Sequence, residues 1–205
     1  MEKEQVFYIH CGNTYTDYDN FLYDLKHKKL WNASDEPVID KWSATLRREL
    51  GEEYQVFMPS MPNKQNAKYE EWKIWFERHF EFIKDGVVLL GWSQGGYFFA
   101  KYISENTLPI KAKSLILVAA PAGPDNFGGE DGGDFAFLDK NLNNISKQVD
   151  KIYILHSKDD FVVPYEHALK YKEALPEAEL ITFEDKNHFL VEELPELVEL
   201  IKGLE

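Results

Sequence analysis

The chain has 205 residues and a formal net charge of -13. This length fits one domain with a full hydrophobic core, and no internal repeat divides residues 1–205. A chain with this much negative charge repels phosphate backbones and anionic lipid surfaces. Neither nucleic acid nor a membrane is therefore an expected partner. The single cysteine excludes an intramolecular disulfide, and no apolar leader or membrane-length run is present. Together these features predict a cytoplasmic protein.

Short apolar runs and helical patterns alternate along the chain. The runs predict six strands, at residues 6–10, 54–57, 87–90, 115–119, 152–156 and 180–183. Apolar residues at helical spacing predict helices at 39–50, 69–83 and 191–201, with two more after Ser93 and after Pro164. Alternating strands and helices are typical of a parallel sheet covered on both faces, with its active site at the carboxyl ends of the strands.

Two segments interrupt this alternation, residues 14–37 and residues 121–149. Both follow predicted strand ends, so we interpret them as rim or lid segments of the active site. The second segment contains a glycine-rich run with Glu130, Asp131 and Asp134. This run resembles a calcium-binding repeat, but it occurs only once and its carboxylates lack the spacing of calcium ligands. We therefore predict a flexible acidic loop. Negative charge there predicts a site that disfavours anionic substrates, and a chain without a long cap domain is expected to have a shallow site suited to small, neutral acyl groups.

A serine lies in the sequence Gly91-Trp92-Ser93-Gln94-Gly95, between a predicted strand and the apolar start of a helix. Glycines two residues either side of Ser93 permit a turn too tight for a Cβ atom. Such a turn exposes the hydroxyl above the sheet edge, where the positive end of the following helix faces it. The motif alone is weak, but its strand–turn–helix context makes Ser93 a candidate nucleophile.

A serine nucleophile needs a base, and the base needs an orienting carboxylate. Asp159 and Asp160 follow the strand that ends at His156, and His188 follows the last strand. The order serine, acid, histidine makes His188 the candidate base, with the acid at Asp160 or Asp159. We assign His156 a structural role, such as bonding the loop backbone, because it is too close in sequence to the acid.

An oxyanion hole needs two converging backbone N–H groups. One is expected from Gln94, directly after the nucleophile, and the other from the loop at residues 10–14, where we favour Asn13 over Gly12. A simple strand-to-loop turn explains Gly12 and Asn13 equally well on spacing alone.

No pattern in the chain predicts a metal or a cofactor. The set His10, His156 and Asp160 lacks ligand spacing, and no phosphate-binding or dinucleotide-binding glycine motif occurs. Nothing in the sequence places a base beside Cys11, so it is expected to be a small apolar residue near the site.

Four blocks of the sequence resemble the small serine hydrolases of the α/β-hydrolase superfamily, of the retinoblastoma-binding-protein-9 and YdeN type. They are residues 11–13, residues 58–63 with Trp72, residues 91–96, and residues 156–164 with 187–189. The resemblance implies an α/β-hydrolase fold with a compact six-stranded parallel sheet in the order 2-1-3-4-5-6, helices on both faces and no large cap. In the family pattern two residues separate the acid from a Val-Pro pair, which implies Asp160 as the acid.

Together these features predict a serine hydrolase that cleaves a small ester or related acyl bond through an acyl-enzyme on Ser93, without a cofactor. The expected partner is a small-molecule acyl substrate. The alternatives are a peptide or C–C bond hydrolase with the same three residues, and a non-catalytic or weakly active binding protein on the same fold.

Overall fold

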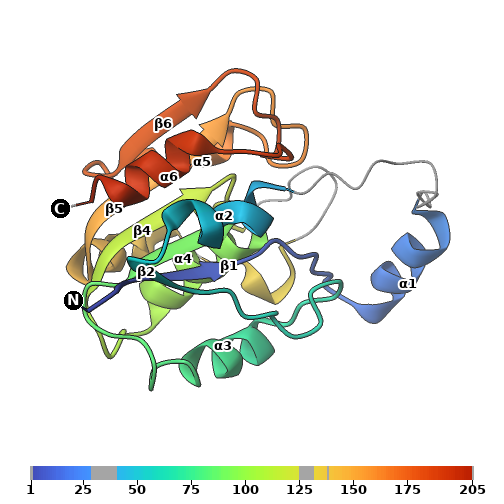
Figure 1. Cartoon of the computed structure of the whole chain (residues 1–205). Coiled ribbons are helices and arrows are strands. Elements are labelled where there is room, and N and C mark those ends of the chain that lie inside the picture. The colour runs from blue at the N-terminus through green and yellow to red at the C-terminus, as the bar shows by residue number, and fades with distance from the viewer. Residues whose placement is uncertain (1, 29–40, 125–131, 138, 205) are drawn as a thin grey trace.

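The computed structural model describes residues 2–28, 41–124, 132–137 and 139–204. Its centre is a parallel sheet in the order β2-β1-β3-β4-β5-β6 (Figure 1), which confirms the expected sheet and strand order. The strands are β1 (Glu4–Ile9), β2 (Tyr54–Phe57), β3 (Val88–Trp92), β4 (Ala112–Val118), β5 (Val149–Ser157) and β6 (Glu179–Phe183). β4 and β5 each begin three residues earlier than expected, at Ala112 and Val149. In β5 the exposed polar residues Asp150 and Lys151 interrupt the apolar pattern at the start of the strand.

Helices cover both faces of the sheet (Figure 1). Phe7 and Ile9 of β1 belong to one buried cluster, whereas Val6 and Tyr8 belong to the other, as the alternation of side chains along a strand requires. The first cluster is completed by α3 (Tyr69–Glu77), α4 (Gln94–Glu105) and α5 (Glu166–Ala174), and the second by α2 (Trp42–Leu50) and α6 (Pro195–Lys202). No helix in the described ranges is long and apolar enough to cross a bilayer.

The described part of the segment 121–149 belongs largely to the core rather than to a rim. It forms the short 3-10 helices η1 (Gly133–Phe135) and η2 (Asp139–Lys147), and Phe135, Leu142 and Ile145 are completely buried against α4 and the sheet. These three apolar residues are at helical spacing, but glycines, charged residues and asparagines surround them, so in the sequence the segment looks like a polar loop.

The acidic run of that segment is only partly described. Glu130 and Asp131 lie outside the described residues. Asp134 is exposed, and its Oδ2 accepts a hydrogen bond from the N–H of Tyr69 at 3.0 Å, at the first residue of α3. A carboxylate there satisfies an N–H group that has no acceptor within the helix.

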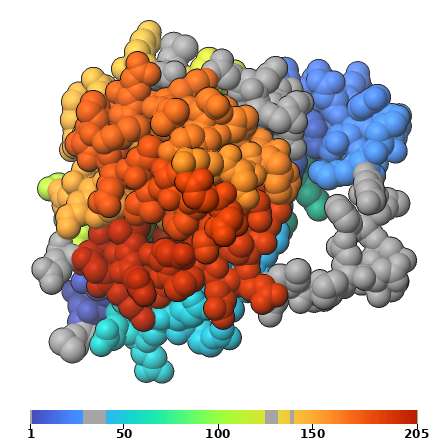
Figure 2. All heavy atoms as spheres, turned by 90° about the horizontal axis from the view of Figure 1, so that it is seen from above, coloured from blue at the N-terminus to red at the C-terminus, as the bar shows by residue number. Residues whose placement is uncertain are grey.

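The segment 14–37 contains a helix that periodicity did not predict, α1 (Tyr18–His27). Asp17 caps it by accepting a hydrogen bond from the N–H of Asn20 at 2.8 Å. The helix buries none of its residues, with Tyr18 and Tyr23 62% and 65% exposed, and it stands out from the body near the carboxyl ends of the strands (Figures 1 and 2). Residues 29–37 lie outside the described residues, so the rim role of this segment stays a prediction.

The start of α4 is packed so closely on β1 that a side chain at Gly95 is excluded. A Cβ atom at Gly95 would lie 2.1 Å from the carbonyl oxygen of Ile9 and 2.7 Å from its carbon, and both are backbone atoms that cannot turn away. We therefore expect Gly95→Ala to lower the free energy of unfolding by about 3 kcal/mol, measured by urea denaturation. Gly203→Ala is the control, because its nearest contact is 3.2 Å; equal stability of both variants would refute the close-packing argument.

Candidate active site

Ser93 occupies a strained turn between β3 and α4. Its φ of 52° and ψ of -117° lie in a region that residues with a Cβ rarely adopt. Its N–H donates to the carbonyl of Val118 at 2.8 Å, which fixes the turn to the neighbouring strand. A Cβ at Gly91 would lie 2.4 Å from the nitrogen of Gly96, so the glycines around the serine are needed for the expected steric reason.

Gln94 is the first residue of α4. The N–H groups in the first turn of a helix have no acceptor within the helix, and the helix dipole makes that end positive. A backbone N–H directly after the serine can therefore donate to a negatively charged oxygen. This geometry suits the oxyanion role predicted for Gln94.

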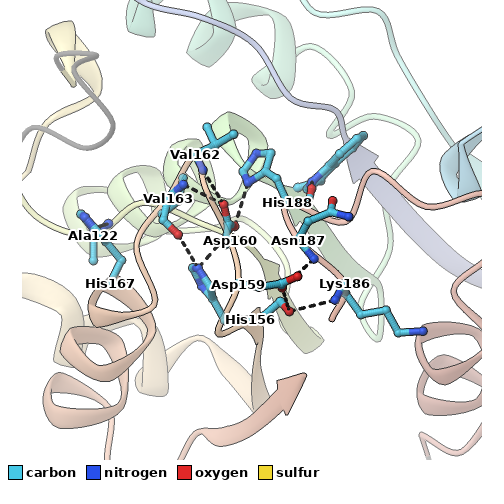
Figure 3. Close-up of polar contacts among 12 residues, drawn as sticks. Ala122, His156, Asp159, Asp160, Val162, Val163, His167, Lys186, Asn187 and His188 are labelled. Atoms are coloured by element: carbon cyan, nitrogen blue, oxygen red, sulfur yellow. Dashed lines mark hydrogen bonds and ion pairs between the residues drawn. The ribbon is translucent and has the colours of Figure 1, made fainter. Parts of the chain in front are cut away.

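Asp160 and His188 meet at the carboxyl ends of β5 and β6 (Figure 3). Oδ2 of Asp160 lies 2.8 Å from Nδ1 of His188, and both side chains are almost completely buried. Oδ1 of Asp160 accepts hydrogen bonds from the N–H groups of Val162 and Val163 at 2.8 and 2.9 Å. The carboxylate is thus held in one orientation, and with Nδ1 as the donor, Nε2 of His188 is left to accept a proton.

Asp159 has a different environment from its neighbour. Its Oδ1 accepts a hydrogen bond from the hydroxyl of Ser157 at 2.5 Å and one from the N–H of Asn187 at 2.8 Å (Figure 3). The same hydroxyl accepts a hydrogen bond from the N–H of Lys186 at 3.0 Å. Asp159 therefore ties the two loops together, while Asp160 is the carboxylate that contacts His188.

Two buried tryptophans hold the main chain around His188. Nε1 of Trp92 donates to the carbonyl of His188 at 3.1 Å, and Nε1 of Trp42 donates to the carbonyl of Phe189 at 3.2 Å. The backbone there is unusual, with φ of 44° at Asn187 and 54° at Phe189. The sequence showed these tryptophans only as core residues, because the carbonyls that they bind are distant along the chain.

Trp92 also links the histidine loop to the candidate nucleophile. It directly precedes Ser93, and its ring centroid lies 6.2 Å from that of His188. Within the described ranges, the hydroxyl of Ser93 makes no hydrogen bond to His188. Such contacts are often long in unliganded enzymes and tighten when substrate binds. The structure thus brings Asp160 and His188 into contact and places Ser93 at the same edge of the sheet.

His156 bonds the loop backbone, as predicted. Its ring is completely buried, and Nε2 lies 2.9 Å from the carbonyl of Val163, an arrangement in which Nε2–H is the donor. The proton on Nε2 leaves Nδ1 without one, and Nδ1 has no hydrogen-bond partner in the described part of the chain. Burial lowers the pKa of His156 below its ordinary value of 6.5, so the ring is neutral in the folded protein at neutral pH.

This buried ring makes stability depend on pH. Below about pH 6.5 His156 is protonated in the unfolded chain but stays neutral in the folded protein, where its pKa is lower. The free energy of unfolding therefore decreases as the pH falls through that value. We expect the free energy of unfolding to fall more between about pH 7.5 and about pH 5.5 in the wild type than in His156→Gln, by up to about 1.4 kcal/mol per pH unit. Glutamine keeps a donor for Val163. Urea titrations with equal slopes against pH would contradict this.

The structure corrects the second predicted oxyanion donor. The N–H of Asn13 donates to the carbonyl of Lys64 at 2.8 Å, and the carbonyl of Asn13 accepts from the N–H of Ala67 at 2.8 Å. Both backbone groups are used in pairing with the segment after β2, so the backbone N–H of Asn13 is not available to an oxyanion. Gly12, the alternative, lies in the same loop and is retained as a proposal.

His10 and Cys11 have structural surroundings. Nδ1 of His10 lies 2.6 Å from the carbonyl of Cys11, and its Nε2 accepts from the N–H of Met61 at 2.9 Å, so both ring nitrogens bond the backbone. Burial raises the pKa of the Cys11 thiol, which keeps it protonated and weakly nucleophilic. The described ranges contain no cluster of three potential metal ligands.

A family model described as serine hydrolase matches residues 29–199. The chain belongs to the serine hydrolase family. A search of curated proteins found no match to this serine hydrolase.

The solved structures that this hydrolase resembles share its fold. The ydeN gene product of B. subtilis is 17% identical, with a TM-score of 0.74, and 98% of each chain is covered. The meta-cleavage product hydrolase of Pseudomonas fluorescens IP01 is 16% identical, with a TM-score of 0.63 over 98% of this chain and 89% of that one. A thioesterase domain from the curacin biosynthetic pathway is 13% identical, with a TM-score of 0.61 over 98% and 92%.

Proposed function

We propose that this serine hydrolase cleaves a small ester or related acyl bond through an acyl-enzyme on Ser93. The observation that carries the proposal is the buried 2.8 Å contact between Asp160 and His188, which aligns the imidazole at the sheet edge that bears the strained serine. The chain order of the serine, the aspartate and the histidine, each at the carboxyl end of a strand, also supports acyl transfer on this fold.

In the proposed reaction, Oγ of Ser93 attacks the carbonyl carbon of the substrate while Nε2 of His188 accepts the hydroxyl proton. Asp160 holds the ring and stabilises the imidazolium that forms. The carbonyl electron pair moves to oxygen, and the N–H of Gln94, with that of Gly12 as the second donor, stabilises the negative charge.

Collapse of this intermediate expels the leaving group, which takes the proton from His188, and leaves Ser93 acylated. A water molecule then gives its proton to His188 and attacks the acyl carbon. The second intermediate breaks down to free the acid and return the proton to the serine oxygen. Every proton transfer uses groups of this chain, so the proposed steps require no cofactor.

The experiment that tests this function is reaction with a fluorophosphonate, followed by intact-mass measurement and peptide mapping. We expect one adduct on the peptide that contains Ser93, and a matching loss of 4-nitrophenyl acetate hydrolysis. A folded protein that gives no adduct and hydrolyses no ester would instead favour the binding-protein alternative. An adduct without ester turnover would direct the search to peptide or C–C bond substrates.

A further inference from the structure

A cavity of about 380 Å³ lies beside the candidate site, between the ends of β1 and β2 and the start of α2. Trp92 forms part of its wall, and Trp92 is also the residue that holds the His188 carbonyl. The volume suits a small organic group. Its wall includes Tyr8, Cys11, Lys41, Ser43, Lys64 and Trp92.

The described residues of this cavity wall carry a net positive charge although the protein is acidic. Lys41 and Lys64 line it, and no aspartate or glutamate of the described ranges does. Nζ of Lys41 lies 5.4 Å from the ring centroid of Trp92. Neither lysine forms an ion pair with a carboxylate in the described part of the chain. Burial raises the pKa of the Cys11 thiol, and the positive charges of Lys41 and Lys64 oppose this by lowering it. Both lysines are therefore close enough to affect a group in the cavity wall electrostatically.

One polar donor in the same wall, the hydroxyl of Tyr8, lacks a hydrogen-bond partner in the described residues. Tyr8 is buried, and its hydroxyl completes no hydrogen bond in the described ranges, although the Ser43 hydroxyl is near enough to affect its pKa. Burial raises the pKa of Tyr8 well above its ordinary value, so the hydroxyl stays a donor. A buried hydroxyl without a partner is unfavourable unless something accepts from it. The positive end of α2, which begins at Trp42, faces the same space.

We propose that this cavity binds a compact anionic group of the substrate, a carboxylate or a phosphate, while the acyl carbon is presented to Ser93. The inference rests on the proposed function, because it assigns a substrate class to that site. It is the opposite of the expectation from the acidic run, because the cavity that includes Trp92, the residue before Ser93, would favour anionic substrates. The ammonium groups of Lys41 and Lys64 supply the charge, and the hydroxyl of Tyr8 supplies a directed hydrogen bond.

The kinetic test compares two esters of matched length, mono-4-nitrophenyl glutarate and 4-nitrophenyl valerate. We expect kcat/KM for the anionic ester relative to the neutral one to fall roughly 3- to 10-fold in the double variant Lys41→Gln, Lys64→Gln, with a smaller difference above about 0.15 M salt. Lys151→Gln is the control, because it removes the same kind of charge at the amino end of β5, the far end of the sheet. A ratio that falls equally in the control would overturn the proposal.

A second test does not depend on catalysis, since Cys11 is the only cysteine and lines the cavity. The rate of alkylation of Cys11 by iodoacetamide should decrease when glutarate or inorganic phosphate is added, because an anion bound in the cavity would shield the thiol. The rate with anionic iodoacetate relative to iodoacetamide should fall in the double lysine variant and stay unchanged in Lys151→Gln. No protection by either anion, with an unchanged ratio, would refute the cavity's role.

The two tests separate this inference from the proposed function. Protection of Cys11 together with full ester hydrolysis by Ser93→Ala would remove the proposed mechanism and leave an anion site. Labelling of Ser93 without protection of Cys11 would keep the mechanism and remove the anion site.

Discussion

Ser93→Ala is expected to lower kcat for 4-nitrophenyl acetate by roughly 10⁴- to 10⁶-fold, because no other hydroxyl occupies the strained turn and no acyl-enzyme can form. The fold should persist, since the turn is held by the N–H of residue 93 on Val118 and by the glycines, and alanine keeps that N–H. Steady-state kinetics and thermal unfolding of the purified variant measure both quantities.

The matched control is Ser114→Ala. Ser114 lies in β4, is completely buried, and has a hydroxyl without a hydrogen-bond partner in the described ranges. Its removal should leave kcat unchanged and stability equal or slightly higher, because an unsatisfied buried hydroxyl is lost. Normal turnover by Ser93→Ala, or an equal loss in both variants, would exclude Ser93 as the nucleophile.

Asp160→Asn is expected to lower kcat by roughly 10⁴-fold. An amide at this position can present its NH₂ group to Nδ1 of His188, which would stabilise the tautomer with the proton on Nε2. That tautomer cannot accept the serine proton, and the imidazolium loses its counter-charge. The measurement is kcat and KM for a neutral ester, with KM expected to change little.

Asp159→Asn is the matched control, because the two carboxylates are adjacent and carry the same charge. Asp159 contacts Ser157 and the N–H of Asn187, and not the histidine. We expect this variant to lose about 1 to 2 kcal/mol of stability, since the loops after β5 and β6 are less firmly joined, with a change in kcat of less than about tenfold. If Asp159→Asn proved inactive and Asp160→Asn active, the assignment of the acid would be wrong by one residue.

Local patterns in the sequence predicted the strands and the serine turn well. A buried strand is a short run of apolar residues, and a turn that excludes Cβ atoms needs glycine. Both can therefore be recognised from about ten consecutive residues. The order of the strands came from the resemblance to a family, because local periodicity says nothing of which strands are neighbours. The helix α1 and the buried η2 were missed although both carry apolar residues at helical spacing, at 18, 21, 22 and 25 in α1 and at 142 and 145 in η2, because the residues between them are mostly polar or charged.

By itself, therefore, the sequence determined the alternation of strands and helices, the position of the tight serine turn and the histidine that follows the last strand. Only the tertiary structure decided which aspartate contacts His188, that the N–H of Asn13 is already used, and that tryptophans hold the histidine loop. It also placed Lys41 and Lys64, which are 23 positions apart in the sequence, in the wall of one cavity with Trp92. The physical reason is range: turns and strands are set by neighbouring residues, whereas hydrogen bonds and electrostatic fields join groups that are close in space and distant along the chain.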